Sequence, residues 1–285
     1  MIVETVRKVL EQLDSSGSEA DASGWGSALG SRFPELEEEY RKLIDPKRDP
    51  IDYSGTVTQA AYFHRYVAGH ALLTCEVLKR VRALVGRPLF ARSELRVSSL
   101  GGGPATELLG LLQYICEVGD EGVRKIQYRI FDKEAGWQHP AELLCSSVES
   151  EVAVELEFRQ LDVTNVSECS KVDVSGDDLV ILGFFISEVC VLPQSNDILS
   201  NIGGILSRMG ASANLLYIDS DAYSFYSFMN RCAGRVRKLA QLVEVQDKIG
   251  ADNIEMDGIF LEYLEEFGYG LKLSGKVVAK YFEKT

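Results

Sequence analysis

The chain has 285 residues, 46% of them hydrophobic, and carries 30 basic against 43 acidic side chains, for a formal net charge of −13. No apolar run approaches the roughly 18 residues of a membrane-spanning helix, so we expect a soluble globular protein with no membrane partner. Because the average field of such a chain repels polyanions, a nucleic-acid partner requires a local basic surface.

The start of the chain and its cysteines bear on the cellular compartment. The first stretch contains Glu4 and basic residues where an export signal needs an uninterrupted apolar region. The six cysteines form no CxxC pair and have no histidine at ligand spacing. These features predict reduced thiols, no metal site and a cytoplasmic or nuclear location. We further expect a monomer or a weak oligomer.

Residues 1–93 are predicted to form a helical cap. Residues 1–13 have the amphipathic spacing of a helix, and the Ser- and Gly-rich stretch 14–31 is expected to be a loop or linker. A second helix is expected over residues 34–43, with Pro34 in its first turn, where the missing N–H costs nothing.

Residues 56–85 carry the remaining helical periodicity of the cap. Gly69 interrupts the pattern, which predicts one bent helix or two joined helices. Tyr62, Arg65 and Tyr66 share one face of this helix. We expect these three side chains to bind a substrate and to close over a ligand site as a lid.

A glycine-rich turn follows the cap. Residues 95–100 predict a buried strand and residues from Ala105 onward a helix, with Gly101, Gly102, Gly103 and Pro104 between them. Three glycines allow positive φ and a close approach of the main chain to a ligand, and the helix N-terminus offers free N–H groups. The turn therefore predicts a site for a nucleotide-like ligand. A tight connection without a ligand is the alternative.

Strands and helices alternate beyond this turn. Such alternation predicts a parallel sheet covered by helices on both faces. Two last strands separated by only two residues cannot be joined by a crossover helix, so they predict an antiparallel hairpin at the sheet edge. The strands are expected over residues 125–131, 154–161, 178–185 and 213–218, and the hairpin over 269–273 and 276–282.

Acidic residues follow the predicted strands. In an open α/β sheet the ligand lies beyond the carboxyl ends of the strands. A carboxylate after the second strand can accept both ribose hydroxyls of a nucleoside, and one after the third can accept the adenine amino group. A solvated turn acid is the alternative for each residue taken singly. The acids at strand ends are Asp132, Asp162, Glu188, Asp219 and Asp221.

In this order the motifs resemble those of the class I S-adenosylmethionine-dependent methyltransferases. The resemblance is carried by SLGGGPATE at the glycine turn, YRIFD and FRQLD at the two acids, DDLVILGFFISEV at the fourth strand, and the closing hairpin. It implies an α/β fold, with a seven-stranded Rossmann-like sheet and an antiparallel C-terminal hairpin. It also implies a methyltransferase domain over residues 94–285 after the helical cap, and an enzyme that uses S-adenosyl-L-methionine.

The resemblance assigns cofactor contacts to the glycine turn and the strand ends. Ser99 departs from the pattern, because the family usually carries an acid there for the methionine amino group. The separation of the glycine turn from Asp132 is also longer than usual, which predicts an extended helix or a loop around residues 118–123. The implied cofactor-binding residues are Ser99, Gly101, Gly102, Gly103, Asp132, Lys133, Asp162, Val163, Phe184 and Phe185.

Two other classes of protein stay open on the sequence. A nicotinamide dehydrogenase uses the same helix N-terminus for a pyrophosphate, but its GxGxxG spacing fails at Thr106. A non-catalytic module that binds S-adenosylmethionine for interaction would keep the glycine turn and lack acceptor chemistry.

Methyl transfer requires alignment of the acceptor and, where needed, removal of a proton. The Asn/Asp-Pro-Pro-aromatic signature of many amino-nitrogen methylases is absent, since the chain reads GFFISE there, and so is the Pro-Cys nucleophile of cytosine-C5 enzymes. We expect Glu188, Ser187 and Tyr223 to be the catalytic residues. A helix cap with its dipole partner is the alternative for Ser187 and Glu188.

The acceptor class rests on charge and on a second resemblance. AAYFHRYVAGH followed by the glycine motif resembles a methyltransferase family that includes fungal uridine-N3 methylases of large-subunit ribosomal RNA. An RNA acceptor requires one basic surface beside the cofactor site. The net charge argues against RNA, so RNA is favoured only slightly over a small-molecule or protein acceptor. The arginines expected on that surface are Arg80, Arg82, Arg87, Arg231, Arg235 and Arg237.

Overall fold

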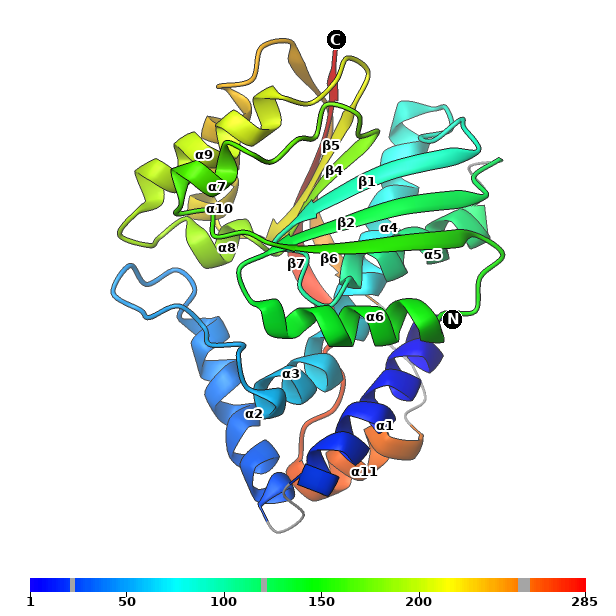
Figure 1. Ribbon diagram of the computed structural model, residues 1–285, viewed down its shortest axis with the longest axis vertical. Coiled ribbons are helices and arrows are strands. Elements are labelled where there is room, and N and C mark those ends of the chain that lie inside the picture. The colour runs from blue at the N-terminus through cyan, green and yellow to red at the C-terminus, as the bar shows by residue number, and fades with distance from the viewer. Residues whose placement is uncertain (21–23, 119–121, 251–256) are drawn as a thin grey trace.

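The computed structural model describes residues 1–20, 24–118, 122–250 and 257–285. Its centre is one seven-stranded sheet with the strand order β3-β2-β1-β4-β5-β7-β6 (Figure 1). The strands from β1 to β5 are parallel, and β7 is antiparallel to both β5 and β6. The bounds are β1 Glu94–Leu100, β2 Lys125–Asp132, β3 Ala153–Gln160, β4 Leu179–Gly183, β5 Asn214–Ser220, β6 Leu239–Gly250 and β7 Ser274–Lys284.

Burial along the strands follows their place in the sheet. All five residues of β4, a central strand, are buried, as expected where helices cover both faces. The edge strand β3 instead alternates half-buried and exposed residues. From β1 the chain builds the sheet outward in one direction through β2 and β3, and then in the other direction from β4 onward. Open α/β sheets bind ligands in the crevice beyond the carboxyl ends of the strands at such a reversal.

Helices cover both faces of the sheet. On one face α4 (Ala68–Val85) packs against α5 (Thr106–Val118) and β6. The other face carries α7 (Val166–Cys169), α9 (Ser195–Ser207) and α10 (Tyr223–Ala233), with the short α8 (Ile186–Val189) beside α10. The η2 turn (Ala135–Trp137) and α6 (Gln138–Ser147) follow β2. None of the helices in the described ranges is long and apolar enough to cross a membrane.

A further helical layer lies at the carboxyl end of the sheet (Figure 1). It contains α1 (Ile2–Ala20), α2 (Trp25–Arg41), α3 (Thr56–Tyr62) and α11 (Gly258–Phe267). Phe33 of α2 stacks on Tyr269 with ring centroids 5.3 Å apart, and the Tyr263 hydroxyl of α11 donates to Asp14 of α1 at 2.5 Å. The layer thus combines segments from before β1 with one from between β6 and β7, while α4 lies against the sheet itself. The boundary predicted at residue 93 stays a prediction.

The long loop predicted over residues 14–31 is wrong. Helix α1 continues to Ala20 and α2 already begins at Trp25, with Pro34 in its interior and not at its first turn. The residues of α2 that face the core recur at helical spacing and are Trp25, Leu29, Phe33 and Leu36. Ser and Gly at the intervening positions obscured this apolar stripe in the sequence.

The predicted interruption at Gly69 also needs correction. The break lies earlier, at a π-helical turn, η1 (Phe63–Val67), and Gly69 continues α4 with helical geometry. A Cβ at Gly69 would overlap the carbonyl oxygen of Lys272, which follows α11. Glycine is therefore required there because another backbone segment approaches closely, and not because the helix bends.

The antiparallel hairpin is confirmed, but its first strand is misplaced in the prediction. Strand β7 pairs with β6, with Gly250 opposite Ser274, and α11 lies in the connection between them. Residues 269–273 form no strand. The loop expected around residues 118–123 falls largely on positions 119–121, which lie outside the described residues.

Two glycines of helices provide a matched test of this packing. We expect Gly69→Ala to lower the free energy of unfolding by about 1–3 kcal/mol, because the added methyl has no room. We expect Gly204→Ala in α9 to leave stability unchanged or raise it by up to about 1 kcal/mol, because no atom lies within 4 Å of the added Cβ. Denaturant unfolding of both variants measures the difference. Equal effects would contradict the close approach at Gly69.

Candidate functional site

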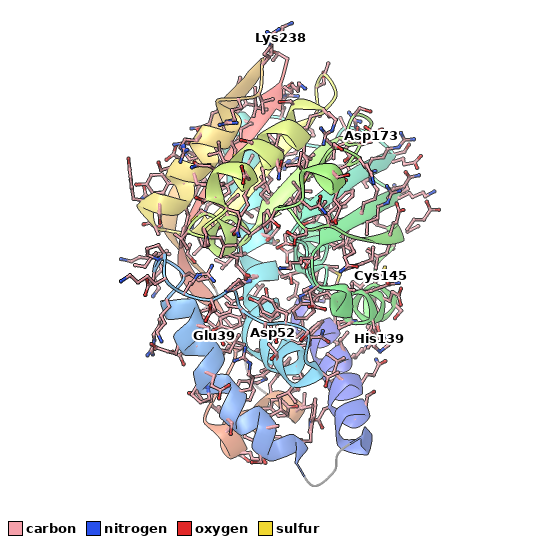
Figure 2. The ribbon with its side chains drawn as sticks, turned by 60° about the vertical axis from the view of Figure 1, so that its left-hand side comes forward. Glu39, Asp52, His139, Cys145, Asp173 and Lys238 are labelled. Carbon is pink, nitrogen blue, oxygen red and sulfur yellow. The ribbon has the colours of Figure 1, made fainter. Side chains whose placement is uncertain are left out.

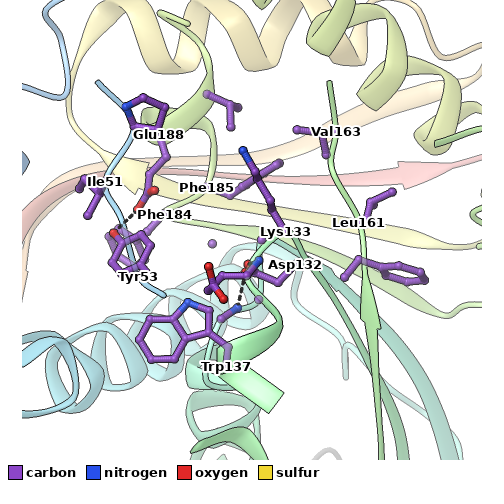
Figure 3. Close-up of a pocket in the computed structure, with 18 of the residues that line it drawn as sticks. Ile51, Tyr53, Asp132, Lys133, Trp137, Leu161, Val163, Phe184, Phe185 and Glu188 are labelled. Atoms are coloured by element: carbon purple, nitrogen blue, oxygen red, sulfur yellow. Dashed lines mark hydrogen bonds between the residues drawn. The ribbon is translucent and has the colours of Figure 1, made fainter. Parts of the chain in front are cut away.

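A cavity of about 430 Å³ lies at the carboxyl ends of β1, β2 and β4, where the helical layer meets the sheet (Figure 3). Many of the predicted site residues line it. They are Tyr62, Gly101, Gly102, Gly103, Asp132, Lys133, Asp162, Val163, Phe184, Phe185 and Glu188. The structure thus gathers residues of the glycine turn, the strand ends and the cap at one site.

The glycine turn has the backbone conformation that its sequence predicts. Gly101 and Gly103 have φ of +67° and +45°. A Cβ at Gly101 would overlap the Phe185 ring, and one at Gly102 would lie 2.9 Å from the Ser99 side chain. Gly103 instead has no atom closer than 3.9 Å to such a Cβ. Glycine is therefore needed for packing at two positions, and the third leaves the main chain open to a ligand.

Asp132, the last residue of β2, is fixed by the backbone. Its Oδ2 accepts a hydrogen bond from the N–H of Gly103 at 2.9 Å, and its Oδ1 accepts one from the N–H of Glu134 at 2.9 Å. Burial raises the pKa of Asp132 to about 6, although both hydrogen bonds oppose this shift. The carboxylate is therefore mostly ionised at pH 7, and its free lone pairs can accept hydroxyl donors.

The end of β3 forms the opposite side of the cavity. Asp162 accepts hydrogen bonds from the N–H of Thr164 at 2.9 Å and from its hydroxyl at 2.7 Å. The Lys133 ammonium lies 3.8 Å from the other Asp162 oxygen. Leu161 and Val163 flank this acid and give the cavity an apolar side (Figure 3).

The end of β4 is held in an unusual backbone conformation. Phe184 has φ of +53°, a region that residues with a Cβ rarely occupy. Its ring stacks on His70 of α4, with centroids 3.7 Å apart and planes 7° apart. Burial lowers the pKa of His70 to about 3, so this imidazole is neutral and serves packing. Strain of this kind persists only where the surrounding structure supports it, and it is common at functional sites.

Glu188 of α8 meets the helical layer in the cavity. The Tyr53 hydroxyl donates to its Oε1 at 2.6 Å, as the dashed line in Figure 3 shows. Arg48 donates to the backbone carbonyl of Glu188 at 2.5 Å, which attaches the 42–55 loop to α8. Burial raises the pKa of Glu188 to about 7, against the lowering effect of the Tyr53 hydrogen bond. Glu188 is therefore a lining group that can exchange a proton near neutral pH.

Three aromatic rings form one wall of the cavity. Tyr53 and Tyr62 each pack against Trp137, with centroid distances of 5.5 and 5.3 Å. The two tyrosine rings meet edge to face at 5.7 Å. Tyr53 and Trp137 were not predicted as site residues, because a loop and a short helical turn carry no periodic pattern. Both lie a few residues from motifs that were recognised, and that is the only signal the sequence offers.

Glu107, in the first turn of α5, is a further lining residue that the sequence analysis did not single out. Its side chain is only 4% exposed, and its Oε2 makes no hydrogen bond. Burial, together with the nearby negative charge of Asp132, raises the pKa of Glu107 to about 8. Its place in SLGGGPATE, at the start of the helix after the glycines, was the available signal.

Five predicted site residues lie outside the cavity lining. Ser99 is buried beneath the turn, and the Ser187 hydroxyl donates to the Phe184 carbonyl at 3.2 Å. Tyr223 is 74% exposed on α10. Arg65 donates to the Gly270 carbonyl at 2.5 Å, and the Tyr66 ring packs 4.5 Å from Tyr40. Of the predicted lid residues, only Tyr62 reaches the cavity.

Charge in the lining is strongly one-sided. Its acids are Asp52, Glu107, Asp132, Glu134, Asp162 and Glu188, and within the described chain Lys133 is its one basic residue. Two of the arginines expected beside the site pair with acids elsewhere: Arg80 with Asp247 at 2.6 Å and Arg87 with Glu283 at 2.7 Å. The cavity is therefore suited to a ligand with positive charge and hydrogen-bond donors.

No protein-family model and no curated protein matches the sequence. Solved structures similar to the chain include an O-methyltransferase family protein from Burkholderia thailandensis, at 12% identity and a TM-score of 0.47 over 91% of this chain and 72% of that one. The CurJ carbon methyltransferase has 10% identity and a TM-score of 0.47 over 96% and 71% of the two chains.

An arsenic(III) S-adenosylmethionine methyltransferase from Chlamydomonas reinhardtii is similar at 13% identity and a TM-score of 0.40. The match covers 67% of this chain and 64% of that one, so this chain spans less than two thirds of its length. The fold is defined by the sheet itself, through its strand order and the antiparallel β7 between β5 and β6. The chain has the Rossmann-like fold of the class I S-adenosylmethionine-dependent methyltransferases.

Proposed function

We propose that this protein binds S-adenosylmethionine in the cavity and transfers its methyl group to an acceptor. The observation that carries the proposal is the convergence of Gly103, Asp132 and Asp162 in one acid-lined cavity at the reversal of strand order. The ligand has a sulfonium centre, an ammonium group, ribose hydroxyls and an adenine amino group, so it brings positive charge and donors to these acceptors.

The described residues fit the parts of this ligand in spatial order. Asp132 would accept the ribose hydroxyls, and Asp162 the adenine amino group next to the apolar Leu161 and Val163. The open main chain at Gly103 allows close approach of the ligand. This arrangement also separates the proposal from a dehydrogenase, because a pyrophosphate would meet six acids and one lysine in the same lining.

When bound, S-adenosylmethionine supplies an electrophilic methyl group and leaves as a neutral thioether. The acceptor's lone pair forms the new bond to carbon, so the chain has to align the acceptor and receive any proton that it loses. Glu188 can receive this proton from its place beside Tyr53. The aromatic wall of Tyr53, Tyr62 and Trp137 would exclude water from the reacting groups.

For the acceptor, we propose a small molecule in preference to RNA. Phosphate contacts would need the predicted arginines beside the cavity, but Arg80 and Arg87 pair with acids of β6 and β7. Lys238, which ends the second basic segment, lies at one extreme of the long axis, away from the lining residue Asp52 (Figure 2). The acidic lining itself favours an acceptor without a phosphate backbone.

Cofactor binding is tested at Asp132. We expect Asp132→Asn to weaken the affinity for S-adenosylhomocysteine by about 1.5–3 kcal/mol, because a charge-assisted hydrogen bond to ribose is lost. Calorimetry measures the affinity, and Asp173→Asn, which changes an exposed acid outside the cavity, serves as the matched control with no expected change. Binding of NAD in place of S-adenosylhomocysteine by the wild-type protein would support the dehydrogenase instead.

Catalysis is tested through the pH dependence of turnover. A base must be ionised to act, so with a pKa of about 7 at Glu188 we expect kcat to rise between pH 6 and pH 8. Glu188→Gln should lower kcat by about 10²-fold or more with little change in cofactor affinity. In Tyr53→Phe the carboxylate loses a stabilising donor, so the midpoint should move to higher pH. A profile that is the same in all three proteins would refute the role of Glu188.

The acceptor class is tested with cell extract and S-adenosylmethionine that carries a labelled methyl group. We expect label in the small-molecule fraction and no binding of structured RNA at physiological salt. Label in RNA, with an affinity that falls steeply as salt rises, would overturn the small-molecule proposal in favour of RNA. Label in protein would identify a protein acceptor, and no label in any fraction would support a non-catalytic module.

A further inference from the structure

The acids that line the cavity differ in how their oxygens are occupied. Five of the six accept hydrogen bonds from within the chain, from backbone N–H groups or, at Glu188, from the Tyr53 hydroxyl. Glu107 differs in one oxygen: among the lining acids of the described chain, its Oε2 is the one carboxylate oxygen that is buried and has no hydrogen-bond partner. A buried oxygen without a partner costs free energy unless a ligand supplies the missing donor.

The position of Glu107 is fixed by the strands around it. A Cβ at Gly183, the last residue of β4, would overlap Oε1 of Glu107, so this glycine makes room for the carboxylate. On the other side stands Ser99, near the end of β1, which lies outside the cavity lining and whose hydroxyl is close enough to Glu107 to lower the pKa of its carboxyl. Glu107 is therefore the acid that faces the cavity between β1 and β4.

Three lining acids follow the order of the strands. The sheet order β3-β2-β1-β4 places Asp162 after β3, Asp132 at the end of β2 and Glu107 between β1 and β4. Neighbouring strands are about 4.8 Å apart, so the three acids form a row along the sheet edge. A nucleoside that bears an amino acid also presents its donors in a row: the adenine amino group, the ribose hydroxyls and the ammonium group.

We propose that Glu107 binds the ammonium group of the amino-acid part of S-adenosylmethionine. The inference rests on the proposed function. It adds to Asp162 and Asp132 the residue that binds the ammonium group. An ammonium group brings three N–H donors and a full positive charge, and both match a buried carboxylate with an unpartnered oxygen. The sulfonium centre has no N–H or O–H to donate, so it would leave Oε2 without a hydrogen bond.

The proposal implies that a proton is released when the ligand binds. The titratable groups around Glu107 are Asp132, which repels its charge, and the buried phenols Tyr62 and Tyr128, whose own pKa values burial raises well above 10. With a pKa of about 8 the Glu107 carboxyl is mostly protonated at pH 7. An ammonium group that binds there favours the ionised form, so nearly one proton should leave.

The first test uses three ligands and an isosteric variant. The ligands are S-adenosylhomocysteine, its analogue with hydrogen in place of the ammonium group, and 5′-methylthioadenosine, which lacks the whole amino-acid part. We expect the wild-type protein to prefer S-adenosylhomocysteine over the desamino analogue by about 10- to 100-fold. Glu107→Gln should lose this preference while its affinity for methylthioadenosine changes less than twofold. Glu142→Gln, the same change at an exposed position of α6, should behave as wild type.

The second test needs no variant and therefore does not depend on how Glu107→Gln folds. Calorimetry at pH 7 in two buffers of different ionisation enthalpy should report release of nearly one proton with S-adenosylhomocysteine and none with the desamino analogue. Equal proton release with both ligands, or an unchanged preference in Glu107→Gln, would overturn the assignment of Glu107. Failure of the wild-type protein to bind any of the three ligands would instead refute the proposed function, and this inference with it.

Discussion

Desolvation of carboxylates at the carboxyl edge of the sheet is the constraint on which the site depends. Burial raises the pKa of Asp132 to about 6, of Glu188 to about 7 and of Glu107 to about 8. The folded protein holds these protons more tightly than an unfolded chain, whose carboxyls titrate near 4. The free energy of unfolding therefore falls as the pH rises from about 4 to about 8. A bound cationic ligand that donates several hydrogen bonds would stabilise the ionised acids and so offset this loss of stability. Buried acids that destabilise the free protein can therefore serve ligand binding.

The sheet and the helical layer contribute different halves of the site. The strand ends supply the acids and the glycine turn, whereas the helical layer supplies Tyr62 and, through the 42–55 loop, Tyr53. Arg48 of this loop donates a hydrogen bond to the backbone carbonyl of Glu188, so the loop that carries Tyr53 is bonded to the helix that carries Glu188. The 42–55 loop is therefore held at the cavity by two contacts with the same short helix, α8.

The features predicted correctly are those with a local signal. Continuous apolar strands, the three glycines and an acid such as Asp132 directly after a strand can be read along the chain, and the structure brings them together. Strand β6 was missed because only Val243, Val245 and Ile249 of its 12 residues are buried, which is too sparse a pattern to stand out in the sequence. Tyr53 and Glu107 depend on tertiary contacts, with α8 for one and the end of β4 for the other, and no pattern within one element encodes such contacts.

The bond between Asp14 and Tyr263 joins residues 249 positions apart in the sequence. Helix α1 precedes all seven strands in the chain, yet its partner α11 follows six of them. Contacts of such high sequence separation close large loops and form late in folding. The contact between α1 and α11 therefore forms late, whereas α1 can already cover its apolar face against α3, α4 and α6, which stand much closer to it in the chain.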